Sequence, residues 1–141
     1  MDSNSCACEL MSRYLRNRPK TNIYFTFGAH HYVGRPGVFF VVNSKSGCGR
    51  SKIIQHLPVG FDFLEVGGGT GCGGIEYFLH NKGKVNKILF TDIHEQALEN
   101  IHENLTMHNL LDVAEVRKSN VFDAINQDEK FDVIYWNVPY F

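Results

Sequence analysis

Two short stretches of the sequence carry residue types that could do chemistry, and the first is EVGGGTG at residues 65–71. An acid, Glu65, stands ahead of Gly67, Gly69 and Gly71, which recur at every second position. Glycines in a strand-to-helix turn let the backbone adopt positive φ angles and let a ligand approach closely. The helix that follows such a turn offers free backbone N–H groups. The pattern predicts a nucleotide-type ligand, with a tight turn that binds nothing as the alternative.

A second acid supports a ligand at this turn. Asp92 ends the apolar segment ILFTD, about 20 residues beyond Gly71, where an acid can accept hydrogen bonds from two ribose hydroxyls. Both NAD and S-adenosyl-L-methionine carry such a ribose, and residues 69–74 also satisfy the dinucleotide pattern G-x-G-x-x-G. Asp92 could instead cap a helix that begins near Glu95. A P-loop is excluded because no Lys-Ser or Lys-Thr pair follows the turn.

Glu65 helps to decide between NAD and S-adenosyl-L-methionine as the cofactor. Its carboxylate, at the end of a strand and just before the glycines, would repel the pyrophosphate of a dinucleotide. S-adenosyl-L-methionine has no phosphate, and its cationic amino-acid end is attracted to an acid. The order acid-x-Gly-x-Gly-x-Gly therefore favours the sulfonium cofactor.

The second stretch is NVPY at residues 137–140. It follows FDVIY, an apolar run typical of a buried parallel strand. Asn137 offers an amide oxygen, Pro139 restricts the backbone, and Tyr140 offers an aromatic face on which a planar group can stack. An Asn-x-Pro turn that only ends a strand is the alternative.

The elements that must position these residues follow a regular order. From residue 61 the hydrophobic pattern predicts strands at 61–66, 85–92, 113–120 and 131–137, and helices at 75–83 and 95–109. This order is typical of an α/β fold with a doubly wound parallel sheet, of which the chain would supply the first half. Residues 1–60, the lead-in, are expected to form a small α+β unit. It has a helix at 7–16, short strands within 21–33 and 38–42, and a helix at 51–57. We therefore expect two units, residues 1–60 and 61–141.

Composition bounds the class of protein. The 141 residues are 43% hydrophobic and 21% charged, as in an ordinary globular domain, and no apolar run reaches the roughly 20 residues of a membrane helix. The first twenty residues lack a signal-peptide core, so we expect a cytoplasmic protein and leave a mitochondrial transit peptide open. The four cysteines lack the spacing of a zinc site, so we expect reduced thiols and no metal.

Charge is unevenly distributed along the chain. Residues 1–60 hold eight Lys/Arg and two acids, whereas residues 61–141 hold six Lys/Arg and thirteen acids. A basic first part predicts a polyanionic partner, such as a nucleic acid, while a chance skew between two solvated surfaces is the alternative.

The motifs LEVGGGTG, TDI and NVPY together resemble class I S-adenosylmethionine-dependent methyltransferases of the "small domain" group. Residues 37–39, GVF, are similar to the lead-in of the ribosomal RNA guanine methyltransferases, and the resemblance covers residues 37–141. Members of the group methylate planar nitrogens: guanine or adenine amines in RNA and DNA, and glutamine amides in proteins. The resemblance implies an N-methyltransferase of this kind. An NAD-dependent oxidoreductase and a cofactor-binding but inactive module are the alternatives.

The resemblance implies a role for each matching residue on the cofactor side. Glu65 and the three alternating glycines would line the methionine end of S-adenosyl-L-methionine, and Asp92 would hold its ribose. Asn120 and Val121 would contact its adenine. The family more often has Asp at the position of Asn120, but an amide oxygen can also accept a hydrogen bond from the adenine amine.

On the acceptor side, the resemblance implies that the side-chain oxygen of Asn137 and the backbone carbonyl of Val138 accept hydrogen bonds from the target amine. Two such acceptors favour a pyramidal nitrogen, whose lone pair is then free to face the methyl group. Pro139 would stiffen the turn and Tyr140 would stack on the acceptor, which is RNA by preference or a protein glutamine. Val138 stands where the family commonly has Pro. The family's sheet has seven strands and four are readable here, so we expect that the remainder of the domain is missing from this chain.

Overall fold

The structure is a computed structural model of the 141-residue chain, and it describes residues 20–39 and 59–138. The helices expected at 7–16 and 51–57 lie outside the described residues, as do most of the strand expected at 38–42 and the residues Pro139 and Tyr140. Val38 and Phe39, the described part of that strand, form neither strand nor helix.

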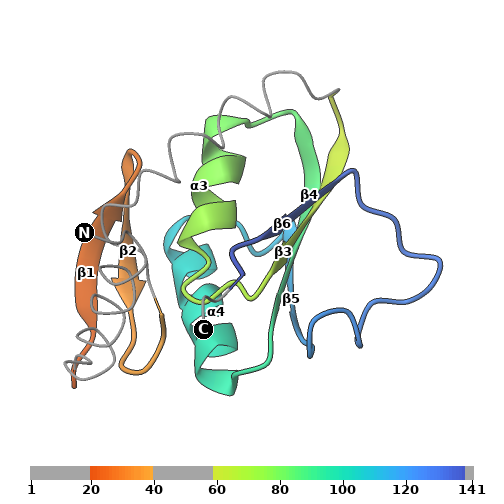
Figure 1. The fold of residues 1–141 in the computed structure, drawn as a ribbon. Coiled ribbons are helices and arrows are strands. Elements are labelled where there is room, and N and C mark those ends of the chain that lie inside the picture. Colours follow the sequence, from red (N-terminus) through yellow and green to blue (C-terminus); the bar gives the residue numbers. More distant parts are fainter. Residues whose placement is uncertain (1–19, 40–58, 139–141) are drawn as a thin grey trace, which may run out of the picture.

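A four-stranded parallel sheet forms the centre of the described molecule (Figure 1). Its spatial order is β5-β4-β3-β6, in which all three pairings are parallel. The strands are β3 (Phe61–Val66), β4 (Val85–Asp92), β5 (Ala114–Lys118) and β6 (Val133–Trp136). The parallel sheet of the predicted α/β fold is thus confirmed, with β5 and β6 as the outer strands of the described sheet.

Two helices, α3 (Cys72–His80) and α4 (Glu95–Met107), cover one face of this sheet (Figure 1). The main hydrophobic core lies between that face and the helices, and its completely buried side chains include those of Phe61, Phe63, Ile75, Phe90 and Ile101. Alternate residues of β3 and β4 supply this core, as expected for strands whose successive side chains point to opposite faces.

Helix α3 begins earlier than its hydrophobic pattern indicates. The pattern starts at Ile75, but the helix starts at Cys72 because Gly71 lies in the left-handed region at φ 73° and ends the preceding turn there. It ends at His80, ahead of the stop expected at Gly83. Helix α4 begins at the expected residue.

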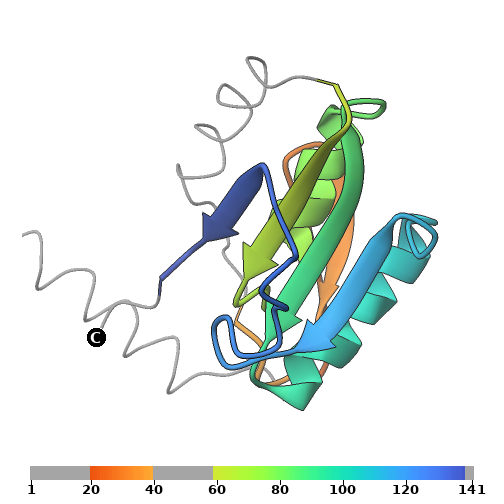
Figure 2. The same ribbon diagram turned by 90° about the vertical axis from the view of Figure 1, so that its right-hand side faces the viewer.

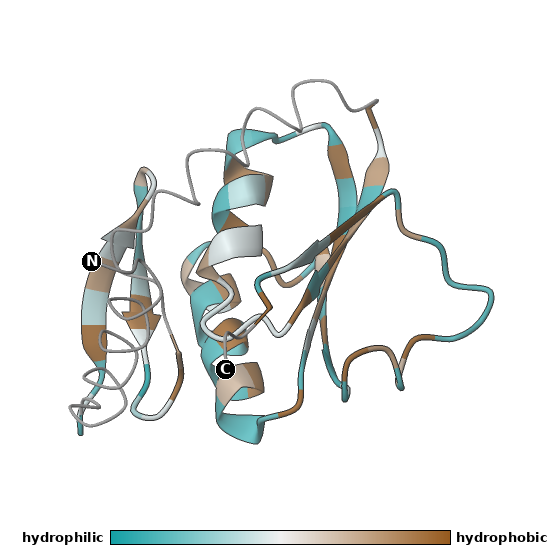
Figure 3. Cartoon of the chain, in the orientation of Figure 1, coloured by the Kyte–Doolittle hydropathy of each residue, from teal (hydrophilic) through white to brown (hydrophobic). Residues whose placement is uncertain are grey.

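The opposite face of the sheet carries residues 119–132, a segment without helix or strand that connects β5 to β6 (Figure 2). The segment is largely polar along its outer part, whereas the central strands are mostly apolar (Figure 3). A small cluster forms where Val121, Ile125 and Phe131 pack on Leu64, Val66 and Leu89. Because β6 is an outer strand, its apolar sequence is only partly buried, and Ile134 and Trp136 are exposed.

The described part of the lead-in is a β-hairpin that packs on the outer side of the helices (Figure 1). Its strands, β1 (Ile23–Phe27) and β2 (His30–Gly34), pair antiparallel, which confirms the short strands expected within 21–33. The hairpin, the helices and the sheet therefore make three layers, with Tyr32 and Val33 of β2 completely buried.

Two buried asparagines of α4 attach the hairpin to the helix layer. Asn104 Nδ2 donates to the carbonyls of Val33 and Thr70, both at 2.8 Å, and its Oδ1 accepts from Val33 N–H at 2.8 Å. Asn100 Nδ2 donates to Val33 O and its Oδ1 accepts from Arg35 N–H, again at 2.8 Å. The side-chain amides thus satisfy backbone groups of the hairpin that a neighbouring strand would otherwise have to satisfy.

Glu76 of α3 makes a second set of contacts to the hairpin. Its carboxylate accepts hydrogen bonds from Ala29 N–H at 2.8 Å, the His30 ring at 2.8 Å and the Tyr32 hydroxyl at 2.7 Å. Burial would raise the pKa of the Glu76 carboxyl, but these three hydrogen bonds hold that pKa below its ordinary value. Burial and the adjacent carboxylate raise the pKa of Tyr32, so its hydroxyl stays protonated and donates.

Asn104→Ala should lower the free energy of unfolding by about 3 kcal/mol, because it leaves the buried Val33 N–H and Thr70 carbonyl without this partner. Urea denaturation followed by circular dichroism measures the change. Gln96→Ala removes an exposed amide from the same helix and should change the stability by less than about 0.5 kcal/mol. Equal stabilities of the two variants would contradict the role given to Asn104.

Candidate functional site

The residues singled out in the sequence meet at one edge of the sheet. In a parallel sheet the carboxyl ends of all strands lie at the same edge, which is where ligands of open α/β sheets bind. Val66 at the end of β3 pairs with Thr91 of β4 and with Trp136 of β6, and Asp92 pairs with Lys118 of β5. The glycine turn, residues 67–71, follows β3, and Asp92 is the last residue of β4. Asn120 lies in the turn after β5, and Asn137 follows β6.

The glycine turn needs glycine for two different reasons. Gly67, Gly69 and Gly71 all have positive φ, at 65°, 58° and 73°, which side chains rarely adopt. A Cβ on Gly69 would also lie 2.7 Å from the carbonyl oxygen of Phe39, so the lead-in passes directly against the turn. A backbone N–H of Gly68 donates to Thr91 O at 3.0 Å and ties the turn to the end of β4.

Glu65 lies beneath the turn, with only 4% of its surface exposed. Its Oε2 accepts a hydrogen bond from the backbone N–H of Gly74 at 2.8 Å, in the first turn of α3. A Cβ on Gly74 would collide with this oxygen, so Gly74 is required by the carboxylate. A carboxylate at a helix N-terminus is favoured by the helix dipole. Its proposed contact with a cofactor stays a prediction.

Asp92 faces the same turn from the end of β4. Its Oδ2 accepts from Gly69 N–H at 3.0 Å and its Oδ1 accepts from His94 N–H at 2.9 Å. The N-cap residue of α4 is His94, so Asp92 supports the start of that helix without being its cap. Each carboxylate oxygen has a second lone pair, so the geometry leaves Asp92 able to accept hydrogen bonds from a ligand's hydroxyls as well.

The turn after β5 lies beside Asp92, because Ser119 N–H donates to Asp92 O at 2.9 Å. Asn120 is exposed there, and its Nδ2 donates to Asp123 Oδ2 at 3.3 Å. Val121 adopts φ 52°, a rare conformation for a β-branched residue. The pair predicted to contact adenine therefore lies next to the acid predicted to hold the ribose.

Asn137 and Val138 follow β6 directly, and both are exposed. Pro139 and Tyr140 lie outside the described residues, so the structure describes the first half of the NVPY motif. The Val66–Trp136 pairing places Asn137 one residue beyond the end of β3, beside the glycine turn.

Sequence reasoning gave no role to two aromatic rings at this edge. Phe122 and Trp136 are 46% and 39% exposed and meet edge to face, with ring centroids 6.2 Å apart. The Trp136 indole nitrogen would lie 3.7 Å from a Cβ on Gly67. The signal was in the sequence, because Trp136 is the single tryptophan and directly precedes Asn137. Exposed aromatic rings offer faces or edges to planar ligands.

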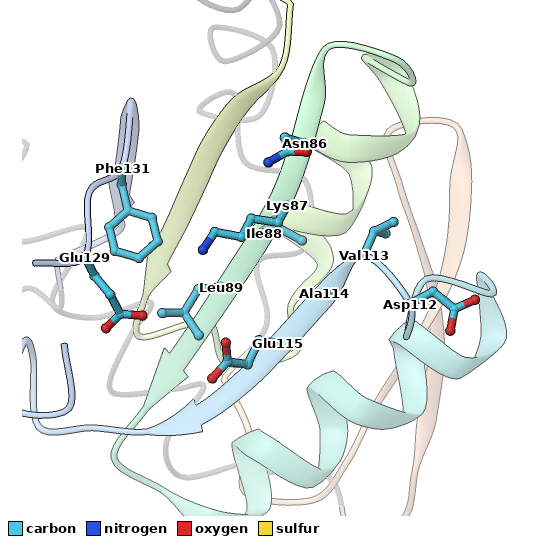
Figure 4. A pocket seen from close by; sticks show the side chains of 10 residues that line it. All are labelled: Asn86, Lys87, Ile88, Leu89, Asp112, Val113, Ala114, Glu115, Glu129 and Phe131. Carbon is cyan, nitrogen blue, oxygen red and sulfur yellow. The ribbon is translucent and has the colours of Figure 1, made fainter. Parts of the chain in front are cut away.

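A separate cavity of about 220 Å³ lies on the sheet face opposite the helices (Figure 4). Residues of β4 and β5 line it together with Glu129 and Phe131, and it includes none of the residues predicted to bind or to react. It is therefore not the candidate site. Within residues 20–39 and 59–138, no cluster of three or more His, Cys, Asp or Glu could hold a metal ion. Helices in the same ranges are too short or too polar to cross a membrane.

The groups at the carboxyl edge fit a nucleoside ligand with a cationic end. Asp92 offers acceptors for hydroxyls, and Glu65 contributes negative charge beneath the turn. A pyrophosphate would meet two carboxylates here, which is unfavourable. The structure therefore fits a sulfonium nucleoside better than a dinucleotide.

Comparison with known proteins identifies relatives with a common activity. The chain is 34% identical over 89 residues to a bifunctional methyltransferase of Rickettsia typhi, which covers 63% of this chain and 16% of the relative. It is 32% identical over 72 residues to a release factor glutamine methyltransferase of Fusobacterium nucleatum, covering 51% and 20% of the two chains. This chain thus matches a fifth or less of the length of these relatives.

Solved structures share the fold. The tRNA m1G37 methyltransferase of M. jannaschii superposes with a TM-score of 0.69 at 21% identity, over 89% of this chain and 37% of that one. The Pyrococcus abyssi tRNA (uracil-54, C5)-methyltransferase, in complex with S-adenosyl-L-homocysteine, superposes with a TM-score of 0.60 at 23% identity. That match covers 82% of this chain and 27% of the other.

The family model of the methyltransferase small domain matches residues 30–141, which include the hairpin's second strand, the whole sheet and every residue of the candidate site. The match agrees with the glycine turn, the acid at the end of β4 and the Asn137 turn, all at one edge of a parallel sheet. This chain belongs to the methyltransferase small-domain family.

Proposed function

We propose that the protein transfers a methyl group from S-adenosyl-L-methionine to a planar nitrogen of a nucleobase, with RNA as the favoured acceptor. The observation that carries the proposal is the place of Asn137. It directly follows β6, at the edge of the sheet that also holds the glycine turn and Asp92. This backbone position beside the candidate cofactor site supports a role for the Asn137 amide oxygen as a hydrogen-bond acceptor for the target amine.

S-adenosyl-L-methionine, the cofactor of this family, supplies an electrophilic methyl group when it is bound. Asp92 would accept hydrogen bonds from its ribose, and Asn120 with Val121 would contact its adenine. Glu65 would favour the cationic methionine end through charge, since its carboxylate is buried and already bonded to Gly74 N–H. The glycine turn would let the chain approach the ligand without a Cβ between them.

Asn137 and Val138 would act on the acceptor. The Asn137 side-chain oxygen and the Val138 carbonyl would accept hydrogen bonds from the target amine and aim its lone pair at the methyl group. Catalysis of this kind is mostly positioning of two reacting groups, which can be worth several orders of magnitude in rate. Val138 lacks the ring of the family's usual Pro, so this turn is less restricted.

Two other functions remain specific alternatives. A glutamine amide in a protein would suit the same two acceptors, and the Fusobacterium relative is named for such an acceptor. A module that binds the cofactor without transferring the methyl group is favoured by Val138. Membership of the methyltransferase family sets the NAD-dependent oxidoreductase aside. A cytoplasmic location is part of the proposal, because the nucleic acid and release-factor acceptors are intracellular.

The direct test is transfer of a labelled methyl group from S-adenosyl-L-methionine into fractionated cellular RNA, DNA and protein, using the natural full-length protein. Label in an RNA base amine supports the proposal, and label in protein glutamine supports the first alternative. Cofactor binding without label in any fraction supports the inactive module.

Asp92→Ala should weaken S-adenosyl-L-homocysteine binding by about 1–3 kcal/mol, because charge-assisted hydrogen bonds to the ribose are lost. Isothermal titration calorimetry measures the affinity. Asp112→Ala, which removes an exposed acid from the turn before β5, is the matched control and should bind like the parent. If Asp92→Ala binds as tightly as the parent, the ribose assignment is wrong.

Asn137→Ala should lower the rate of methyl transfer by about 10² or more and leave cofactor affinity nearly unchanged. The lost acceptor aims the target amine in the transition state, whereas the cofactor is held by the turns after β3, β4 and β5. Single-turnover methylation beside cofactor titration separates the two effects. Asn126→Ala, an exposed asparagine in segment 119–132, serves as control. Near-parental turnover of Asn137→Ala would leave NVPY as a turn and favour the inactive module.

A further inference from the structure

We propose that Arg117 is a positioning residue that holds the Asn120 turn, residues 119–125, in the conformation that accepts the cofactor's adenine. The proposal rests on the proposed function, because it takes this turn as the adenine side of the site. Arg117 would set cofactor affinity through the turn without touching the cofactor. We call its hydrogen-bonded set, formed with Glu115, Glu129 and the Ala124 carbonyl, the Arg117 clamp.

All five N–H donors of the Arg117 guanidinium are used within the clamp. Its Nη1 donates to Ala124 O at 2.7 Å and to Glu129 Oε2 at 2.9 Å. Its Nη2 donates to Glu129 Oε1 at 3.1 Å and to Glu115 Oε1 at 2.6 Å, and its Nε donates to Glu115 Oε1 at 2.9 Å. A planar fork can satisfy two carboxylates and a carbonyl at once, whereas a lysine has one point of charge.

The clamp joins a strand to the segment that crosses the sheet. Arg117 and Glu115 come from β5, whereas Glu129 and Ala124 belong to segment 119–132. Figure 4 shows Glu115 and Glu129 on the same face of the sheet, on either side of Leu89. Glu129 Oε2 also accepts from Asn126 N–H at 2.8 Å, so the carboxylate fixes the backbone of its own segment as well.

A line of contacts leads from the clamp to the predicted adenine contacts. Ala124 offers its carbonyl to Arg117, while its N–H donates to Ser119 Oγ at 3.0 Å. Ser119 Oγ in turn donates to Val121 O at 3.0 Å. A backbone hydrogen bond of 3.1 Å, from Asp123 N–H to Asn120 O, closes the same turn. Three hydrogen bonds, through Ala124 and Ser119, therefore connect Arg117 to the backbone of Val121.

Val121 has the rare backbone conformation that the Arg117 clamp would stabilise. Its φ of 52° is unfavourable for a β-branched residue and persists only where the surroundings impose it. Its side chain packs against the Leu64–Val66–Leu89 cluster, which supplies part of the restraint. The clamp supplies the rest, because it fixes the distal side of the turn through Ala124. Release of Arg117 would let Val121 relax and move Asn120 away from Asp92.

The ion pair between Glu129 and Arg117 stays formed over the pH range in which enzymes are usually assayed. Hydrogen bonds from Arg117 and from Asn126 N–H lower the pKa of Glu129 to about 2. Because the folded-state pKa is depressed, the ion pair is fully formed above the ordinary carboxyl range and is lost only as pH falls towards that value. Cofactor affinity should therefore show no titration of Glu129 between about pH 6 and 9.

The experiment compares S-adenosyl-L-homocysteine binding by calorimetry for the parent, Arg117→Ala, Arg117→Lys, Glu129→Gln and Lys118→Ala. If release leaves the competent turn about a tenth populated, Arg117→Ala loses about tenfold in affinity. Arg117→Lys keeps the charge without the fork and should recover little of the loss, and Glu129→Gln should show a smaller loss. Lys118→Ala is the matched control, because it removes a neighbouring, exposed ion pair with Glu95 and should bind like the parent.

A double-mutant cycle with Asn120→Ala separates positioning from general loss of stability. If Arg117 acts through the turn, Arg117→Ala should weaken binding less in the Asn120→Ala background than in the parent. Two results would overturn the proposed role of Arg117 and leave the proposed function standing. One is that the affinity losses of Arg117→Ala and Asn120→Ala add, and the other is that both Arg117→Ala and Glu129→Gln bind like the parent. Should Arg117→Ala fail to fold, Glu129→Gln and Arg117→Lys decide the question by the same measurement. A parent protein that does not bind S-adenosyl-L-homocysteine would overturn the proposed function, and the clamp with it.

Discussion

The buried carboxylate of Glu65 is the constraint on which the site depends. A carboxyl group with 4% of its surface exposed must be hydrogen-bonded, and Gly74 N–H at the start of α3 supplies one such bond. The bond requires α3 to begin close above the end of β3. That closeness in turn requires Gly74, because a Cβ there would collide with the carboxylate. It also requires Gly71, whose left-handed conformation ends the turn so that α3 can begin at Cys72.

Backbone bonds then extend this fixed point along the edge of the sheet. Gly68 N–H reaches Thr91 O, and Ser119 N–H reaches Asp92 O, so the turns after β3, β4 and β5 are joined in sequence. Asn104 connects the glycine turn to the hairpin, since it binds both Thr70 O and Val33. The lead-in is thus not an appendage. It is attached to the same turn that it passes over at Phe39.

Local patterns predicted the parts of this architecture that depend on local chemistry. The apolar runs indicated four strands, the glycines indicated the turn, and Asp92 followed the second of these strands as expected. The sequence did not predict that the hairpin packs outside the helices, because Asn100 and Asn104 appear as ordinary polar positions of α4 until their partners are known. Arg117 was overlooked for the same reason. Its partners Ala124 and Glu129 lie 7 and 12 residues further along the chain, in a segment without regular structure. Hydrophobic periodicity carries no information about such pairs.

Residues with unfavourable backbone conformations or close backbone approaches are concentrated at the edge of the sheet that holds the candidate site. Gly60 and Gly83, at the opposite edge, also have positive φ, but a Cβ there would meet nothing, so they serve only as turns. At the site edge, Gly69 is needed for both its φ and the approach of Phe39, and Val121 holds a rare conformation without being glycine. Phe122 and Trp136 expose large aromatic surface beside them. Strain and exposed aromatic surface that the fold alone does not need are expected where a ligand is bound. The distribution of strained and exposed residues therefore favours this edge, and not the cavity on the sheet face over β4 and β5, as the place where the protein acts.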